Sequence, residues 1–372
     1  MINFLTLKDK SFGLDFSDLS LKIACLKKRG RFFKLASWGE TRLEPGIIDK
    51  GDIKDEEKLA KAIKEGVKNI KGSKIKTKNI VASLPEKRAF FETIIMPKMS
   101  KEELKSAVPF EAENYIPLPM SEAYFDFQTI PSLDKKESDY SEVLVGAVSK
   151  EIVDPYVSCI KKAGFLPEAL EIESQAISRA LIKNEFIPVS ILIIDFGRSR
   201  TSFIMLSKGS ISFTCSIPIS SDMLTLSISD SLQTGKTESE KLKIKYGLNS
   251  ATGKKLSQKE ENLRKKIKEA MHPILDDLAK QAKKYISYHE SSSKNNPKRK
   301  VEKVLLSGMA SNLKGFTDFL SLKLKIPVEL GNPWVNILPD TLKEVPNLSF
   351  SDSLGYTTAL GLALRCVKDK TA

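Results

Sequence analysis

The sequence predicts an α/β fold made of two similar lobes, because a stretch of strand, acidic turn and return strand occurs in it twice. The clearer copy spans residues 191–209, where the β-branched run 191–194 is typical of a strand covered on both faces. Asp195 ends this run, and we expect Gly197 to supply the positive φ of a sharp turn before a return strand at 201–206. An acid beside a glycine turn suits the binding of a phosphate or its metal ion, although ordinary hairpins also contain such acids.

The second copy lies near the N-terminus. Asp15 and Phe16 match Asp195 and Phe196, and a basic residue followed by glycine comes at nearly the same distance after each acid. The acids are 180 positions apart (195 − 15), a separation that fits duplicated domains better than a solenoid. We therefore expect two lobes facing each other across a cleft, where backbone N–H groups grip a polyphosphate and both carboxylates hold a hydrated divalent ion.

Length and composition describe a folded chain of two domains. The 372 residues allow each lobe a core of its own, and 41% hydrophobic with 29% charged residues is typical of globular proteins. No apolar run is long enough to span a bilayer, and the first residues lack the pattern of a signal peptide. The four scattered cysteines favour buried thiols in a reducing compartment. With only two histidines, a histidine metal site is not expected, and we place His289 at an exposed helix end.

The net charge of +13, from 60 Lys and Arg against 47 Asp and Glu, favours acidic partners. Nucleic acid, nucleotides and the anionic inner leaflet of a membrane all fit this description. The same balance also fits a chain whose helices expose solvated lysines with glutamates between them. Because no zinc-finger, RRM or KH signature accompanies the lysines, nucleic acid is not expected as a partner.

The first lobe reads as three antiparallel strands over 11–40, a loop over 44–52, an amphipathic helix over 55–70 and a strand over 78–85. Lys22 follows Asp15 by seven positions (22 − 15). On a hairpin, this spacing returns its ammonium to the acid, within reach of a bound phosphate. The alternative is an exposed strand lysine without a role.

A module of different character follows, over about 90–165. Strands are expected at 89–96, 124–128 and 142–149, with a polar tip at 134–141. Ser100 and Glu103 form a capping box that opens a helix to about Tyr115, and Pro109 should kink this helix. A second helix over 151–163 is closed by Gly164. We interpret the module as an insertion into the first lobe.

Beyond the module, a strand over 167–174 runs into a helix over 175–184. Glu173 at this junction could orient an attacking water, or could be a helix-start carboxylate stabilised by the helix dipole. After the second hairpin, we expect helices at 222–232, 236–246 and 260–287, with a loop at 249–259 and a basic, disordered turn at 289–300. A strand from 301 ends at Ser307 and Gly308, a turn that could lie against adenine or ribose or be a plain βα loop. A last helix from about Asp352 packs into the core.

These features together resemble the actin, sugar kinase and Hsp70 fold and, within it, the PilM family of type IV pilus assembly proteins. The resemblance covers nearly the whole chain, and the EAE-x-YIP run is specific to the family. It rests on EPGIIDKG at 44–51, MPKMS at 96–100, FEAENYIP at 110–117, FDF at 125–127, LSGMASNL at 306–313 and VELGNP at 328–333.

The resemblance implies an actin-like (ribonuclease H-like) duplicated fold, with an inserted subdomain of the SHS2-like type that PilM shares with the cell-division protein FtsA. The expected parts are a first lobe over 9–88, completed by 166–188 and by the C-terminal helix and tail at 352–372, and the insertion at 89–165. The second lobe covers 189–220 and 301–351, with a helical, basic subdomain at 221–300.

The family also implies ATP and Mg bound between the lobes. Asp15 and Asp195 would match the two phosphate acids and hold Mg through waters, and Lys22 would match the phosphate lysine. Glu173 would match the water-positioning catalytic acid. The full set of expected nucleotide-binding residues is Asp15, Ser17, Ser20, Lys22, Asp195, Gly197, Arg198, Thr201, Ser220, Lys241, Ser307, Gly308 and Met309.

Several positions depart from the family pattern. Ser17 replaces a glycine of the first turn, Asp18 adds a negative charge beside the expected phosphates, and Ser220 replaces the first glycine of a pair. Met309 follows Gly308 where a second glycine is usual. Each added β-carbon or charge weakens a phosphate contact. We therefore expect nucleotide binding and at most weak ATP hydrolysis.

The family implies an adaptor role at the cytoplasmic face of the inner membrane. Such a protein captures the N-terminal cytoplasmic peptide of a PilN-like membrane protein, links the pilus platform to its motor, and reaches the membrane through these partners. A working actin-like ATPase and an FtsA-like division or filament protein are the alternatives, and self-association stays open. The FtsA-like alternative calls for a C-terminal amphipathic membrane helix, and residues 365–372 are too short for one.

Overall fold

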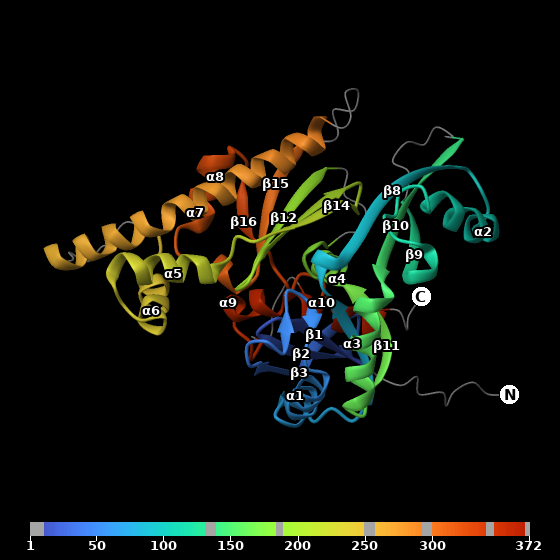
Figure 1. The fold of residues 1–372 in the computed structure, drawn as a ribbon, viewed down its shortest axis with the longest axis horizontal. Helices are drawn as coiled ribbons and strands as arrows, with labels where there is room; N and C mark the ends of the chain where they lie inside the picture. Colours follow the sequence, from blue (N-terminus) through green and yellow to red (C-terminus); the bar gives the residue numbers. More distant parts are fainter. Residues whose placement is uncertain are drawn as a thin grey trace. The chain divides into compact units, whose positions relative to one another are not determined.

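The computed structural model describes residues 11–130, 139–183, 189–248, 257–291, 300–339 and 346–368 (Figure 1). Most of the predicted polar tip at 134–141, loop at 249–259 and basic turn at 289–300 lies outside these residues, as does the tail after 368. The chain divides into two compact units. The first contains Met1–Phe186, Ser210–Phe213 and Asn332–Ala372, and the second contains Ile187–Gly209 and Thr214–Gly331.

A six-stranded sheet of order β11-β7-β1-β2-β3-β6 forms the centre of the first unit. β1 pairs antiparallel with β2 and parallel with β7, and β7 is parallel to β11. The three antiparallel strands expected over 11–40 are therefore confirmed. The strand bounds are β1 Ser11–Ser17, β2 Ser20–Arg29, β3 Phe32–Arg42, β6 Lys71–Gly72, β7 Asn79–Leu84 and β11 Leu166–Ile172, with the short pair β4 Ile48–Asp49 and β5 Asp52–Ile53 beside them.

The last helix, α10, packs directly on β1, β2 and α4. Two glycines allow this close approach. A Cβ on Gly13 would lie 2.6 Å from the carbonyl oxygen of Ala359, and one on Gly361 would lie 1.9 Å from that of Ala176. The helix thus belongs to the core, as predicted. The helices of this unit's main body are α1 Glu56–Lys68, α3 Lys150–Lys162, α4 Glu173–Leu181, α9 Phe350–Ser353 and α10 Thr357–Lys368.

Helix α1 shows why its sequence folds as it does. Asp55 accepts a hydrogen bond from the Lys58 N–H as N-cap, and the apolar positions Leu59 and Ile63 are fully buried. Helix α3 packs against α1, and Lys162 donates to Glu57 at 2.7 Å. Tyr156 of α3 donates to the carbonyl of Gly51 at 2.9 Å, which fixes the helix to the loop between β4 and β5.

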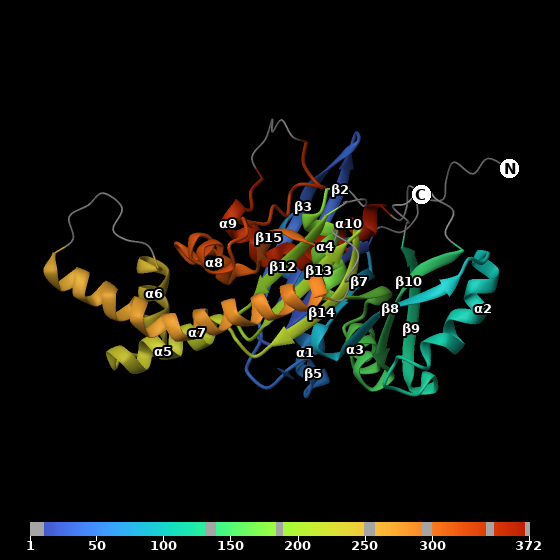
Figure 2. The ribbon, with the colours of Figure 1, turned by 90° about the horizontal axis from the view of Figure 1, so that it is seen from above.

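A separate three-stranded sheet of order β8-β10-β9 carries α2 on one face (Figure 2). Ser100 and Glu103 make the predicted capping box of α2, and Pro109 lies inside the helix. A core of apolar side chains joins the helix to the sheet, with Val108, Val143 and Val145 at its centre. The bounds are β8 Ala89–Pro97, α2 Lys101–Ala112, β9 Ala123–Ile130 and β10 Tyr140–Ser149. We call this part the small subdomain.

The second unit repeats the strand plan of the first. Its sheet has the order β14-β13-β12-β15-β16, with β12 antiparallel to β13 and parallel to β15, which is parallel to β16. β12 thus corresponds to β1, and β15 to β7. The strands are β12 Ser190–Phe196, β13 Thr201–Ser207, β14 Ser210–Ile217, β15 Val301–Ser307 and β16 Val328–Leu330. The helices are α5 Ser221–Leu232, α6 Lys236–Tyr246, α7 Gln258–Ser291 and α8 Phe316–Leu324.

Two sequence expectations need correction. His289 is 1% exposed, and its Nε2 lies 2.9 Å from the Ser190 hydroxyl, so the expected exposed helix end is wrong. Gly197 does not have a positive φ. Its lack of a Cβ matters instead because one would lie 2.8 Å from the Arg200 carbonyl oxygen.

Over the described residues, no helix combines the length and apolar character needed to cross a bilayer.

Candidate functional site

The first acid-bearing hairpin is formed by β1 and β2, and a side-chain contact connects it to the end of β7. Asp15 is 7% exposed, and its carboxylate accepts a hydrogen bond from the Ser83 hydroxyl at 3.0 Å. The same hydroxyl accepts from the Phe16 N–H at 2.8 Å. Ser83 therefore fixes the acid at the carboxyl end of the strand. Lys22 is the direct cross-strand partner of Asp15, as the hairpin spacing predicts.

The turn of this hairpin is held by its own side chains. Ser17 donates to the Ser20 carbonyl at 3.0 Å, and the Lys22 ammonium donates to the Ser20 hydroxyl at 3.1 Å. The Asp18 carboxylate accepts from the Gly51 N–H at 2.9 Å. The negative charge predicted beside the phosphates thus contacts the 44–51 segment, one of those on which the family resemblance rests.

Two further acids lie at the same sheet edge. Glu173 begins α4 directly after β11, which is parallel to β7. The carboxyl ends of β1, β7 and β11 therefore place Asp15 and Glu173 at one edge of the sheet. Glu86, which is 3% exposed, accepts from the Ser174 N–H at 3.0 Å and so caps α4. The sequence reasoning missed Glu86 and Ser83.

The second acid-bearing hairpin has a matching neighbour. Asp195 on β12 pairs in register with Ser307 at the end of β15, as Asp15 lies beside Ser83 at the end of β7. Ser307 is fully buried, and its hydroxyl has no hydrogen-bond partner among the described residues. Gly308 has φ 85°, and a Cβ on it would lie 2.4 Å from the Phe196 carbonyl oxygen, so only glycine fits there. Met309 follows it, 47% exposed.

The turn 197–200 packs onto the start of α5. The Ser221 N–H donates to the Gly197 carbonyl and the Asp222 N–H donates to the Arg198 carbonyl, both at 3.1 Å. Ser220 is the N-cap and accepts from the Met223 N–H at 3.4 Å. The first three N–H donors of the helix are therefore used within the chain. A phosphate would have to displace these contacts to bind at this helix start.

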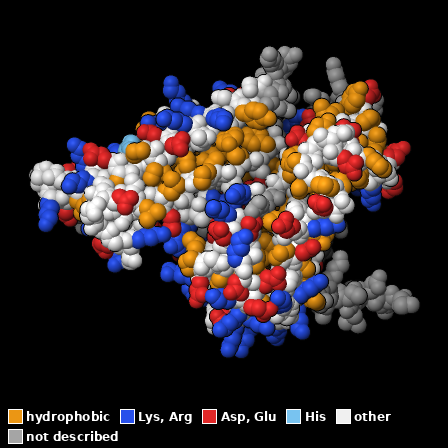
Figure 3. Space-filling view, in the orientation of Figure 1, with side chains coloured by type: hydrophobic (Ala, Val, Ile, Leu, Met, Phe, Trp, Pro, Cys, Tyr) orange, Lys and Arg blue, Asp and Glu red, His pale blue; other side chains and the backbone are white. Residues whose placement is uncertain are grey.

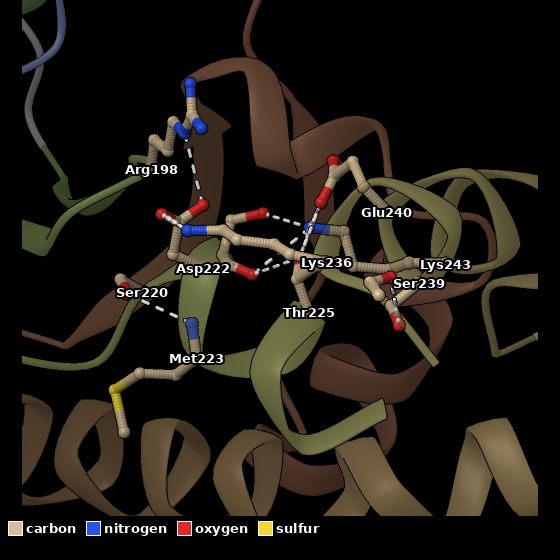
Figure 4. A network of polar contacts seen from close by, with 11 residues as sticks. Arg198, Ser220, Asp222, Met223, Thr225, Lys236, Ser239, Glu240 and Lys243 are labelled. Atoms are coloured by element: carbon tan, nitrogen blue, oxygen red, sulfur yellow. Dashed lines mark hydrogen bonds and ion pairs between the residues drawn. The ribbon is translucent and has the colours of Figure 1, made fainter. Parts of the chain in front are cut away.

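Asp222, at the start of α5, pairs with two cationic side chains (Figure 4). Its carboxylate accepts from Arg198 at 3.1 Å and from Lys236 at 2.8 Å. Burial opposes its ionisation, but the hydrogen bonds and charges of Lys236 and Arg198 outweigh burial and lower the pKa of Asp222. Arg198, an expected phosphate ligand, is thus paired with an internal carboxylate.

Lys243 of α6 is a buried lysine that anchors the start of α5 (Figure 4). It is 4% exposed and donates to the Ser221 hydroxyl at 2.6 Å and to Thr225 at 2.8 Å. Burial lowers the pKa of Lys243, while the nearby Glu240 carboxylate partly opposes that shift. The side chain of Lys241, the lysine named from the sequence, is 71% exposed and pairs with Glu238 at 3.7 Å.

Thr201 is also among the expected residues. Its buried hydroxyl donates to the Ile219 carbonyl at 2.7 Å. The structure thus groups the expected residues into two sets. Asp15, Ser17, Ser20, Lys22 and Glu173 belong to the first unit, and the remaining residues belong to the second.

Comparison with known proteins identifies the family. The model of the family described as type IV pilus assembly protein PilM matches residues 13–367. The chain belongs to the PilM family. This match includes both acid-bearing hairpins and the small subdomain, so it confirms the resemblance drawn from the sequence motifs.

Known structures support the same fold. The structure of a PilM–PilN type IV pilus biogenesis complex superposes with a TM-score of 0.78 and 24% identity, covering 96% of this chain and 98% of that one. MreB 5 of Spiroplasma citri bound to AMPPNP gives a TM-score of 0.53 and 12% identity, with 98% and 97% covered. The actin-like fold predicted for this PilM family member is therefore confirmed.

Similarity to FtsA is also present, over a short segment. The cell division protein FtsA of Borreliella burgdorferi is 32% identical over 92 residues, which is 25% of this chain and 22% of that protein. The chain thus matches less than a quarter of the length of this relative. The similarity agrees with the expected kinship of the PilM family and FtsA.

Proposed function

We propose that this chain is a PilM-like adaptor that binds the N-terminal cytoplasmic peptide of a PilN-like protein at the cytoplasmic face of the inner membrane. Family membership and the solved PilM–PilN complex support a partner of this kind. In this role the chain connects the pilus platform to its motor and reaches the membrane through these partners.

The observation that carries the proposal is an exposed apolar pair on the small subdomain, Ile95 of β8 and Tyr140 of β10, which share the sheet face away from α2. Ile95 is 67% exposed and Tyr140 is 63% exposed, and Phe110, on the solvent side of α2, is 77% exposed. Figure 3 shows hydrophobic side chains gathered over β8 and α2, at the upper right. Such groups are characteristic of protein interaction sites because water contacts them unfavourably. A short peptide with apolar anchors would bury the pair of Ile95 and Tyr140.

Replacing Ile95 and Tyr140 together with serine is expected to weaken peptide binding at least tenfold. Each apolar side chain removed from a peptide interface forfeits about 1.5 kcal/mol or more of burial. The measurement is isothermal calorimetry with a synthetic copy of the cytoplasmic tail of a PilN-like protein from the same organism.

The matched control is Leu322→Ser, which removes a side chain that is 80% exposed on α8 of the second unit. It should leave the affinity unchanged. Absence of any heat with the parent chain would contradict the adaptor role. Equal weakening by the control would contradict the choice of surface.

Nucleotide binding is a second candidate function, favoured by the paired arrangement of acids and serines. Asp15 with Ser83 and Asp195 with Ser307 hold matching positions at two strand ends, and the buried Ser307 hydroxyl suits a polar ligand group. Carboxylates fit a hydrated Mg ion of a bound nucleotide, which would supply phosphate oxygens as further ligands. Within the described segments, no three His, Cys, Asp or Glu side chains form a metal site of their own.

The start of α5 does not fit a phosphate in the same way. Its N–H groups already donate to the turn 197–200 and to Ser220. The two nearby cationic side chains, Arg198 and Lys236, are paired with Asp222. We therefore propose weak nucleotide binding with at most slow hydrolysis. The role of Glu173 in positioning a water remains part of the alternative, a working ATPase.

Asp195→Asn is expected to lower the affinity for Mg-ATP at least tenfold, because it removes the charge that would hold the hydrated ion. Titration with a fluorescent ATP analogue, with and without EDTA, measures this effect. Asp230→Asn, on the exposed side of α5, should have no effect. Rapid turnover that Glu173→Gln abolishes would favour the working ATPase over the adaptor with a weak site.

A further inference from the structure

A lysine-rich surface of the first unit takes no part in the hairpins or in the small subdomain. Between Lys58 and Lys78 the chain has eight lysines and a single acid, Glu65. All eight lysines are exposed: Lys58, Lys61, Lys64, Lys68, Lys71, Lys74, Lys76 and Lys78. Figure 3 shows basic side chains gathered around α1, at the bottom of the view. We call this surface the lysine face.

The fold holds these lysines outward. Leu59, Ile63 and Gly66 bury the opposite side of α1, which packs on β2 and β3. Lys61, Lys64 and Lys68 therefore share the solvent side of the helix, since residues three and four apart lie on one face.

The segment after α1 begins with β6, which is held at the edge of the sheet. β6 pairs with β3, and the Ser73 N–H donates to the Ala36 carbonyl at 2.9 Å. Gly72 has φ 88°, and a Cβ on it would lie 2.3 Å from the same carbonyl oxygen. Lys71 is thus held on the edge strand beside β3, the strand on which α1 packs, and the lysines at 74–78 continue the basic run along the sequence.

The charge of this surface is not balanced internally. Lys58 pairs with Glu44 and Asp55, but the other seven lysines form no ion pair within the described part of the chain. Over its 34 residues, by contrast, α7 alternates basic and acidic side chains and pairs several of them. The basic excess of the lysine face is therefore a local feature and not only a property of the whole composition.

We propose that the lysine face binds directly to the anionic headgroups of a lipid bilayer. Lysine side chains are flexible point charges, which suit a diffuse anionic surface, and the segment 58–78 contains no arginine for bidentate phosphate recognition. It also contains no aromatic residue on which a nucleic acid base could stack. This contact requires no partner protein, so it is independent of the proposed peptide binding.

The test is flotation of the full chain with lipid vesicles at about 0.1 M salt. We expect binding to vesicles of phosphatidylcholine with one third phosphatidylglycerol, and none to vesicles of phosphatidylcholine alone. Each lysine near an anionic surface contributes about a fivefold change in partitioning, so neutralising three should weaken it on the order of 100-fold. The variant is Lys61→Gln, Lys64→Gln and Lys68→Gln combined, because glutamine keeps helix propensity.

The matched control neutralises three exposed lysines of α7, by Lys266→Gln, Lys283→Gln and Lys284→Gln combined. Both variants lose the same net charge, so only the control should retain binding. Equal loss in both variants, or no binding of the parent chain to anionic vesicles, would overturn the proposal. Tighter binding of a duplex DNA oligonucleotide through the same three lysines would also overturn it, in favour of nucleic acid.

Discussion

Replacing Gly361 with valine is expected to lower the free energy of unfolding of the first unit by about 4 kcal/mol or more. A Cβ at this position would lie 1.9 Å from the carbonyl oxygen of Ala176, and the clash is with backbone that cannot rotate away. Helix α10 would have to move off α4 and β1. Effects of this size arise from overpacking against a rigid partner.

Urea unfolding followed by tryptophan fluorescence measures this loss. Both tryptophans of the chain, Trp38 and Trp334, belong to the first unit and pack in one cluster with α10. The signal therefore reports on the affected region. Gly39→Ala is the control, because a Cβ there makes only ordinary contacts at 3.5 Å with Ile70. A valine variant that unfolds at the parent's urea concentration would refute the close packing of α10.

Lys243→Ala is expected to destabilise the contact between α5 and α6 by about 3 kcal/mol. The substitution leaves the Ser221 and Thr225 oxygens without their buried donor and removes the packed aliphatic stem. Relief of the buried charge offsets part of this loss. Hydrogen exchange of the α6 amides should accelerate by roughly 150-fold.

Lys241→Ala is the matched control for this substitution. Both lysines lie on α6 and pair with a glutamate three positions before them, but Lys241 is exposed. Its loss should change exchange less than threefold, since exposed pairs contribute about 0.5 kcal/mol. Similar acceleration in both variants would show that burial of Lys243 does not hold the two helices together.

The same lysine gives a pH dependence with a defined sign. Burial lowers the pKa of Lys243 in the folded chain below its ordinary value of 10.5. Between these two pKa values the unfolded chain binds more protons, so the contribution of Lys243 to stability increases as pH rises. The difference in stability between the parent chain and Lys243→Ala should therefore widen from neutral pH towards pH 10.5.

Local signals in the sequence predicted most of the elements correctly. The capping box of Ser100 and Glu103 fixes the start of α2 through contacts three residues apart, which a sequence reveals directly. The repeat of Asp15 and Asp195 predicted the duplicated strand plan, because strand–turn–strand units are also local.

Residues whose environment depends on distant contacts were harder to predict. His289 is buried against Ser190, 99 positions away along the chain, and nothing near it in the sequence indicates this contact. Lys243 was missed in favour of Lys241, although the helical spacing of Ser239, Lys243 and Tyr246 marks one buried face of α6. Ser83 could have been found by extending the repeat to the parallel strands, where Ser307 holds the matching position.

The close packing of α10 on β1 has a consequence for synthesis of the chain. The first unit draws residues from both ends of the sequence, whereas the second lies entirely between 187 and 331. On a ribosome, the earliest strands must therefore wait with their α10-facing surface uncovered until translation has passed residue 368. The second unit can therefore fold first, and the N-terminal strands of the first unit complete their packing last.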